Sequence, residues 1–127
     1  IIEKNINNKI ILIDRFTDST IAYQHYGLGI NLNLVKKINS FVIKNLKPDL
    51  TFLSLVNNSN LKKRLKLRKS LNKYDKFKYS FYKKVQNGFL KIAKNKSKYI
   101  IINSNLRNIN ENAKIIIKKV DKILKNN

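Results

Sequence analysis

Three short apolar runs, separated by longer stretches with helical periodicity, constrain the fold of this 127-residue chain more than any other feature. The runs lie at residues 9–13, 50–56 and 98–103, and turn-forming or charged residues follow them. Short continuous apolar runs are typical of strands that are buried on both faces of a parallel sheet. Because helical segments separate the runs, their order indicates βαβ units in an α/β layer fold.

The segments between the runs carry the start and stop signals of helices. Thr17 or Asp18 offers an N-cap for one helix. Residues 31–46 carry apolar side chains at helical spacing, and Pro48 ends that helix. The expected helices cover about residues 1–7, 17–24, 31–46, 60–68, 75–95 and 110–125.

Lysine dominates the charge of the chain. Lys and Arg number 28 against 7 Asp and Glu, a net charge of +21, and 24 of the 28 are Lys. A basic face binds phosphate by counterion release, so a nucleic acid is one partner that this charge indicates. The competing explanation is an AT-rich codon bias, which favours Lys, Asn and Ile in every protein. We favour the codon bias, because nucleic-acid binders use Arg for bidentate contacts and this chain has four.

The composition excludes several classes of protein. The chain has no Cys and one His, which excludes a disulfide scaffold and a Cys-ligated zinc site. No apolar run approaches the roughly 18 residues that span a bilayer. A hydrophobic fraction of 43% is too high for a disordered polycation. The length fits one small domain or part of a larger one.

Asp14 and Arg15 stand directly after the first apolar run. Ligands of open α/β sheets bind at the carboxyl ends of the strands, so this pair is a candidate site. The carboxylate suits magnesium or its waters, and the guanidinium suits bidentate binding of phosphate. Taken alone, the pair is better explained as a salt bridge at the end of a strand.

Two sequence blocks resemble a known family. Residues 14–24 read Asp-Arg-Phe-Thr-Asp-Ser-Thr-Ile-Ala-Tyr-Gln, and residues 48–51 read Pro-Asp-Leu-Thr. The first block resembles the signature of bacterial thymidylate kinases, and the second resembles the start of that family's next strand. The similarity runs without gaps over about residues 9–89. Further matches to the family's lid and following helix are Arg64, Arg68, Lys73, Asp75, Phe81, Val85 and Phe89.

The resemblance implies a fold and a reaction. The family has a three-layer P-loop kinase-like fold with a parallel sheet. Its members make dTDP from dTMP and ATP with magnesium. The resemblance therefore implies a nucleotide kinase that serves dTTP synthesis, with dTMP and ATP as substrates and Mg²⁺ as cofactor. Phosphoryl transfer of this kind relies on positioning and charge neutralisation.

The resemblance also implies roles for individual residues at the dTMP side. Arg15 would bind the phosphate of dTMP. Ser19 and Thr20 would line the nucleotide, with Thr20 near the base. Tyr23 would pack on the deoxyribose and disfavour a 2′-hydroxyl, and Gln24 would face the thymine.

The catalytic set that the resemblance implies is Asp14, Arg15, Arg68 and Lys73. Asp14 would hold magnesium directly or through water. Arg68 and Lys73 would come from the lid, at about residues 65–75, over ATP. The family usually has Arg where Lys73 stands, and Lys lacks the planar fork, so Arg68 is the better candidate for an arginine finger.

Several family positions are changed. An acidic residue at the end of the second strand is replaced by Leu55, and a Pro-Glu pair by Asn58 and Ser59. Leu28 stands where the family has Arg, and His25 where it has Gly. We interpret His25 as a tolerated loop residue. These changes put the efficiency of the site in doubt and leave the fold assignment intact.

No Gly-x-x-x-x-Gly-Lys-Ser/Thr loop occurs in the chain, which has three glycines. The resemblance places that loop, and the central strand that carries it, before residue 1. We therefore expect residues 1–127 to be the C-terminal part of a single kinase domain, with its N-terminal strands missing. We also expect that this part by itself neither folds stably nor phosphorylates dTMP.

The resemblance implies a cytoplasmic protein that is a homodimer at full length, without a membrane, and nucleic acid is not an expected partner. Two alternatives stay open. One is a basic nucleic-acid-binding protein derived from a P-loop-like fold, and the other is a related deoxynucleoside or nucleotide kinase.

Overall fold

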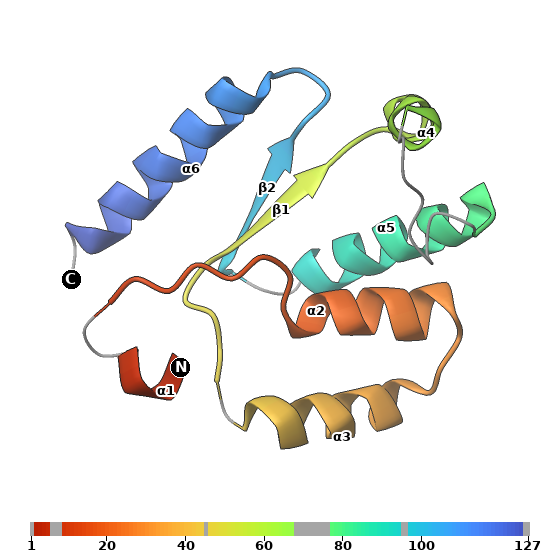
Figure 1. The fold of residues 1–127 in the computed structure, drawn as a ribbon, viewed down its shortest axis with the longest axis horizontal. Helices are drawn as coiled ribbons and strands as arrows, with labels where there is room; N and C mark the ends of the chain where they lie inside the picture. The colour runs from red at the N-terminus through yellow and green to blue at the C-terminus, as the bar shows by residue number, and fades with distance from the viewer. Residues whose placement is uncertain (1, 6–8, 45, 68–76, 95–96, 126–127) are drawn as a thin grey trace.

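A parallel pair of strands forms the centre of the fold (Figure 1). Strand β1 spans Thr51–Leu55 and strand β2 spans Tyr99–Asn103, and the register pairs Thr51 with Tyr99 and Leu55 with Asn103. The runs at 50–56 and 98–103 therefore form strands as the sequence predicts, shortened by one or two residues. Their connection contains helices, as parallel strands require.

The computed structural model describes residues 2–5, 9–44, 46–67, 77–94 and 97–125. The helices within these ranges are α1 (Ile2–Asn5), α2 (Thr17–Thr20), η1 (Ile21–Gly27), α3 (Leu32–Ile43), α4 (Asn58–Lys66), α5 (Tyr79–Lys94) and α6 (Ile109–Leu124). Helix η1 is a π-helix that continues α2 without a break. Within the same ranges, no helix combines the length and apolar character that crossing a membrane requires.

The elements form layers around the strand pair. Helix α6 lies on one side of β1 and β2, and α5 with the joined α2 and η1 lies on the other (Figure 1). Helix α3 packs against α2 and η1, and α4 follows the carboxyl end of β1 (Figure 1). This arrangement confirms the predicted α/β layer fold with a parallel sheet.

The hydrophobic core lies between η1 and α5. Ala22 of η1 is fully buried against Phe81, Tyr82 and Val85 of α5. The two helices approach closely because α5 carries Gly88, whose missing side chain makes room for the ring of Tyr26. The buried core therefore holds the helix that carries the second half of the signature block.

Asn side chains begin the three longer helices outside the core. Asn31 accepts hydrogen bonds from the backbone N–H groups of residues 33 and 34 at the start of α3. Asn57 accepts one from Asn60 at the start of α4. Asn108 and Glu111 form a reciprocal capping box at the start of α6. Part of the high Asn content therefore has a local structural use.

The prediction of a strand at residues 9–13 is wrong. The segment is extended but outside the sheet, and Leu12 is 86% exposed and Ile10 61% exposed. A strand needs a neighbour that pairs with its N–H and C=O groups, and among the described residues the sheet consists of β1 and β2 alone. An apolar run therefore does not form a strand where no neighbouring strand pairs with it.

The predicted cap of the helix after this segment is also wrong. Helix α2 begins at Thr17 and its N-cap residue is Phe16, which makes no capping hydrogen bond through its side chain. Asp18 lies in the first turn, where its negative charge favours the positive end of the helix. The helix continues through η1 to Gly27, three residues beyond the predicted end. His25 consequently lies in a helix, and its prediction as a loop residue is wrong.

Candidate functional site

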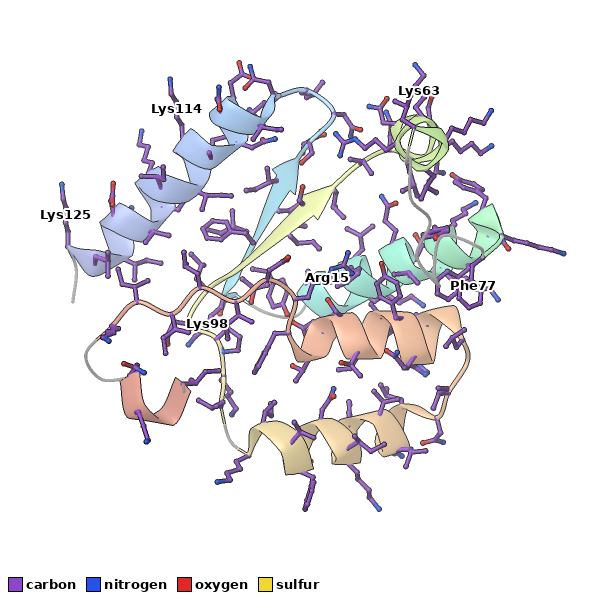
Figure 2. All side chains as sticks on the ribbon, in the orientation of Figure 1. Arg15, Lys63, Phe77, Lys98, Lys114 and Lys125 are labelled. Carbon is purple, nitrogen blue, oxygen red and sulfur yellow. The ribbon has the colours of Figure 1, made fainter. Side chains whose placement is uncertain are left out.

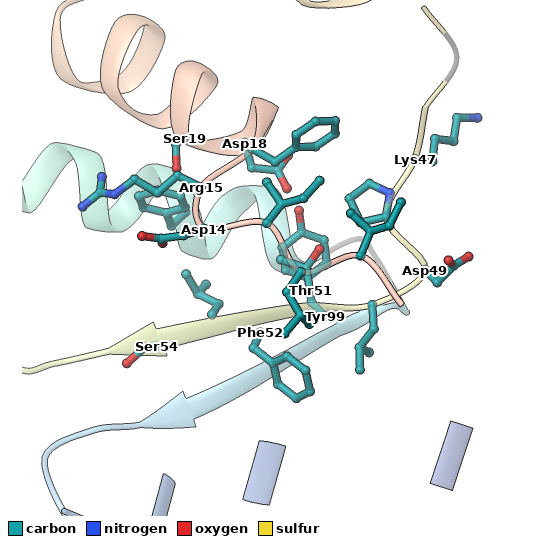
Figure 3. A pocket seen from close by; sticks show the side chains of 18 of the residues that line it. Asp14, Arg15, Asp18, Ser19, Lys47, Asp49, Thr51, Phe52, Ser54 and Tyr99 are labelled. Atoms are coloured by element: carbon teal, nitrogen blue, oxygen red, sulfur yellow. The ribbon is translucent and has the colours of Figure 1, made fainter. Parts of the chain in front are cut away.

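The turn from the extended segment into α2 places Asp14 and Arg15 at the edge of a large cavity (Figure 3). Both side chains are exposed. Arg15 has a φ of 67°, in the left-handed region that non-glycine residues seldom adopt. Such conformations persist where the surroundings hold them and are concentrated at functional sites. The second residue of the signature block is therefore also the strained residue of this turn.

Arg15 contacts the aromatic ring of Tyr23. Its Nη1 donates a hydrogen bond of 3.3 Å to the Tyr23 hydroxyl, and its Cζ lies 5.6 Å from the ring centroid. The hydrogen bond to Tyr23 raises the pKa of Arg15 above its ordinary value, and the nearby charge of Asp14 acts in the same direction. Arg15 therefore stays fully charged and can serve as a fixed positive group for an anion.

The π-helix determines where Tyr23 and Gln24 point. The wider turn is marked by the hydrogen bond of 3.0 Å from the Leu28 N–H to the Tyr23 carbonyl, five residues back. Tyr23 faces the cavity, whereas Gln24 is outside its lining. The Gln24 Oε1 is buried and finds no hydrogen-bond partner among the described residues.

The cavity has a volume of about 1270 Å³ and lies between the extended segment and β1. Its walls are the segment 9–16, the stretch 46–56, and side chains of α5 and α6. Figure 3 shows Asp14, Arg15 and Ser19 together at one end of this space, above β1. The described cavity therefore joins an apolar body to a charged end, which is the usual composition of a small-molecule site.

The structure brings together four of the predicted site residues. Asp14, Arg15, Ser19 and Tyr23 all line the cavity. Thr20 follows Ser19 on α2 but, like Gln24, is absent from the lining. The predicted lid residues Arg68 and Lys73 lie outside the described residues, and so does Asp75.

A polar cluster at the carboxyl ends of β1 and β2 was not predicted from the sequence. The hydroxyl groups of Ser54 and Ser104 form a short hydrogen bond across the strands. Arg64 of α4 donates to the Ser104 carbonyl at 3.2 Å. Asn105 accepts from the backbone N–H of Asn57 at 2.8 Å. The rule that ligands bind at the carboxyl ends of strands pointed to this place, but the side chains bond one another across 40 to 50 residues of sequence.

Two of the changed family positions have structural explanations. The His25 Nδ1 lies 2.8 Å from the Ile30 carbonyl oxygen, and its ring packs at 4.6 Å on Tyr26. His25 therefore fixes the end of η1. Leu28 is the C-cap residue of η1 and is half exposed. In the described part of the chain, no three His, Cys, Asp or Glu side chains gather closely enough to hold a metal ion by themselves.

Comparisons with known proteins agree with the resemblance. The family model for thymidylate kinase matches residues 1–116. A thymidylate kinase from Trichodesmium erythraeum is 39% identical over 97 residues, which are 76% of this chain and 43% of that protein. One from Mycoplasma capricolum is 38% identical over 125 residues, 94% of this chain and 57% of that protein.

A solved structure gives the same result for the fold. The crystal structure of thymidylate kinase from Ehrlichia chaffeensis matches with a TM-score of 0.62 and 32% identity, over 91% of this chain and 53% of that one. The chain thus spans about half the length of the relatives that it matches. The match to a P-loop kinase fold confirms the predicted fold class.

Proposed function

The chain belongs to the thymidylate kinase family, and from this premise we propose that it supplies the dTMP side of a site that transfers the γ-phosphate of ATP to dTMP. The product is dTDP, which serves dTTP synthesis. The observation that carries the proposal is the placement of Asp14, Arg15, Ser19 and Tyr23 along one cavity. These residues belong to the signature block that resembles the family.

Arg15 is the proposed ligand of the dTMP phosphate. Its guanidinium is exposed at the charged end of the cavity and is held by Tyr23. A bidentate, charge-assisted contact from Arg orients a phosphate. It also neutralises the negative charge on the phosphate oxygens during phosphoryl transfer. Arg15 therefore acts as a catalytic residue as well as a binding residue in this proposal.

The remaining dTMP contacts follow from α2 and η1. Ser19 lines the cavity one turn after Arg15, and Tyr23 presents its ring to the same space. We assign Ser19 to the nucleotide and the ring of Tyr23 to the deoxyribose. Thr20 and Gln24 lie outside the cavity lining, and we assign them to the base on the resemblance to the family alone.

Magnesium and ATP complete the proposal. Mg²⁺ is commonly bound through one or two carboxylates, with phosphates and waters as its other ligands. The exposed Asp14 beside Arg15 fits such a site as a single carboxylate, directly or through water. When bound, the ion would neutralise phosphate oxygens. Arg68 and Lys73 are the proposed lid cations over ATP, and Arg68 is the candidate arginine finger.

We further propose that residues 1–127 are part of a single kinase domain with the lid at about 65–75. The curated relatives are about twice as long as the matched region, which supports this assignment. A cytoplasmic location and a homodimer at full length complete the proposal. The 127-residue chain alone is expected neither to fold stably nor to phosphorylate dTMP, because its sequence has no P-loop motif.

Binding of dTMP to a full-length kinase domain that carries residues 1–127 tests the proposal, because these residues alone are not expected to fold stably. Calorimetry at two salt concentrations measures the binding. Arg15→Ala should abolish the binding, because it removes the phosphate contact. Arg107→Ala is the matched control, since it removes the same charge from an exposed position between β2 and α6. In any preparation that turns over dTMP, Arg15→Ala should lower kcat/KM by orders of magnitude.

A titration with RNA in parallel separates the main alternative. Affinity for RNA that falls steeply with salt, combined with no affinity for dTMP, would overturn the proposal in favour of a nucleic-acid-binding protein. Equal loss of dTMP binding in the Arg15 and Arg107 variants would also count against it, because it would show a diffuse charge effect.

A further inference from the structure

The conformation of Arg15 carries free-energy costs that contacts with its neighbours can offset. Its backbone has a φ of 67°, a conformation that costs free energy for a residue with a side chain. Its side chain is long, exposed and rich in rotamers, and freezing such a side chain on binding lowers affinity. A contact that fixes the guanidinium before the ligand arrives removes part of that cost.

Tyr23 makes this contact in two ways. Its hydroxyl accepts a hydrogen bond of 3.3 Å from Arg15 Nη1, and its ring lies under the guanidinium at 5.6 Å. The two residues are eight positions apart, on different sides of the turn into α2. Tyr23 therefore holds the guanidinium through a hydrogen bond and through a contact with its ring.

The ring of Tyr23 is fixed from the other side by α5. It packs edge to face on Phe81 with a centroid distance of 5.9 Å, and on Phe89 with 6.4 Å. Phe81 is buried, stacks on Phe77 at 4.3 Å and meets the edge of Tyr82. Because two aromatic rings of one helix hold Tyr23, its orientation follows that of α5.

We propose that Tyr23 is a positioning residue, which holds the Arg15 guanidinium ready for an anionic phosphate at the charged end of the cavity. Phe81 and Phe89 in turn hold the ring of Tyr23. The identity of the phosphate as that of dTMP rests on the proposed function. The positioning itself is a property of the free protein. It adds a role for the Tyr23 hydroxyl to the role of its ring as a wall against the sugar.

The first test observes Arg15 directly, without any ligand. The ¹⁵N signals of the Arg15 Nε and Nη groups are recorded for a full-length protein that carries residues 1–127, for its Tyr23→Phe variant and for its Tyr23→Leu variant. A held guanidinium has slowed rotation and a separate Nη signal. Tyr23→Phe removes the hydrogen bond and Tyr23→Leu removes the ring as well, so restraint should decrease in that order. Tyr26→Phe, on the same helix, is the control and should leave the Arg15 signals unchanged.

The second test compares dTMP with thymidine, which lacks the phosphate. In Tyr23→Phe, we expect dTMP to bind about three- to tenfold more weakly, the equivalent of a weakened contact to a charged group, and thymidine to change by less than about twofold. An equal loss for both ligands would show that Tyr23 acts on the sugar alone, and would overturn the positioning role.

The two tests fail separately. If the chain binds no dTMP but the Arg15 signals lose their restraint in Tyr23→Phe, the proposed function fails and the positioning stands. If the Arg15 signals are the same in the wild type and both variants, the positioning is refuted whatever the affinity for dTMP. If Tyr23→Leu loses the native amide spectrum, Tyr23→Phe decides alone.

Discussion

The contact between Gly88 and Tyr26 allows a prediction whose sign the structure decides. A Cβ at position 88 would lie 2.6 Å from Cδ2 and Cγ of Tyr26 and 2.7 Å from its Cβ. Replacing Gly by Ala inside a helix normally stabilises it by about 1 kcal/mol. Here the added methyl meets atoms that real structures keep farther away. The two effects on Gly88→Ala are therefore opposed.

The Tyr26 Cβ makes the clash hard to relieve. Rotation of the side chain moves the ring but leaves Cβ in place, so η1 and α5 must separate. Overpacking of this kind costs about 1–3 kcal/mol, and an immovable neighbour favours the upper half of that range. After the gain in helix propensity is subtracted, we expect Gly88→Ala to lower the free energy of unfolding by about 1–2 kcal/mol.

Urea unfolding of a full-length protein that carries residues 1–127, followed by circular dichroism, measures this change, because these residues alone are not expected to fold stably. Ser80→Ala, at an exposed position of α5, is the matched control and should be neutral or slightly stabilising, because it reports helix propensity alone. Tyr26→Ala removes two of the three close atoms, so it should rescue Gly88→Ala in part. If Gly88→Ala is as stable as the wild type or more so, the close packing of η1 on α5 described above is refuted.

Further predictions concern stability away from that contact. Ser54→Ala should lower the free energy of unfolding by about 1–3 kcal/mol, because it leaves the buried Ser104 hydroxyl without its hydrogen bond to Ser54. Ser104→Ala should cost less, because water can bond the exposed Ser54 hydroxyl. Urea midpoints of both variants measure the difference. Asn57→Ala should lower the free energy of unfolding by about 1 kcal/mol through loss of the N-cap of α4, visible as faster amide exchange there. Phe41→Ser should change the free energy of unfolding by less than about 0.5 kcal/mol, because Phe41 is 88% exposed. It should also reduce self-association, measured by sedimentation. A large loss of stability would show that the ring is buried.

The strands and most helices follow from local sequence signals. The runs at 50–56 and 98–103 formed strands, and the helix expected at 31–46 is found at Leu32–Ile43. The run at 9–13 has the same local signal and formed no strand. The difference lies in the neighbours, because pairing of backbone groups is a property of the whole sheet and no pattern in one segment reports it.

The site was predictable as a set of residue types but not as a geometry. The signature block indicates Asp14, Arg15, Ser19 and Tyr23, which line one cavity, and also Thr20 and Gln24, which do not. No sequence pattern predicts the contact between Arg15 and Tyr23, because it depends on the positive φ of Arg15 and on the π-helical turn of η1. Both are departures from regular backbone geometry, and neither Arg nor Tyr is a residue type that predicts such a departure.

The use of arginine in the described structure bears on the net charge of +21. Arg15 donates a hydrogen bond to the Tyr23 hydroxyl, and Arg64 donates one to the Ser104 carbonyl, so each guanidinium has a defined acceptor. The lysines of α4, α5 and α6 with described side chains are exposed. Arg15, Arg64 and Arg107 are exposed as well, so exposure does not separate arginine from lysine. The two residue types differ in number. The chain has four Arg against 24 Lys, which favours a codon bias, because a surface selected for a polynucleotide would use the planar fork of Arg more often.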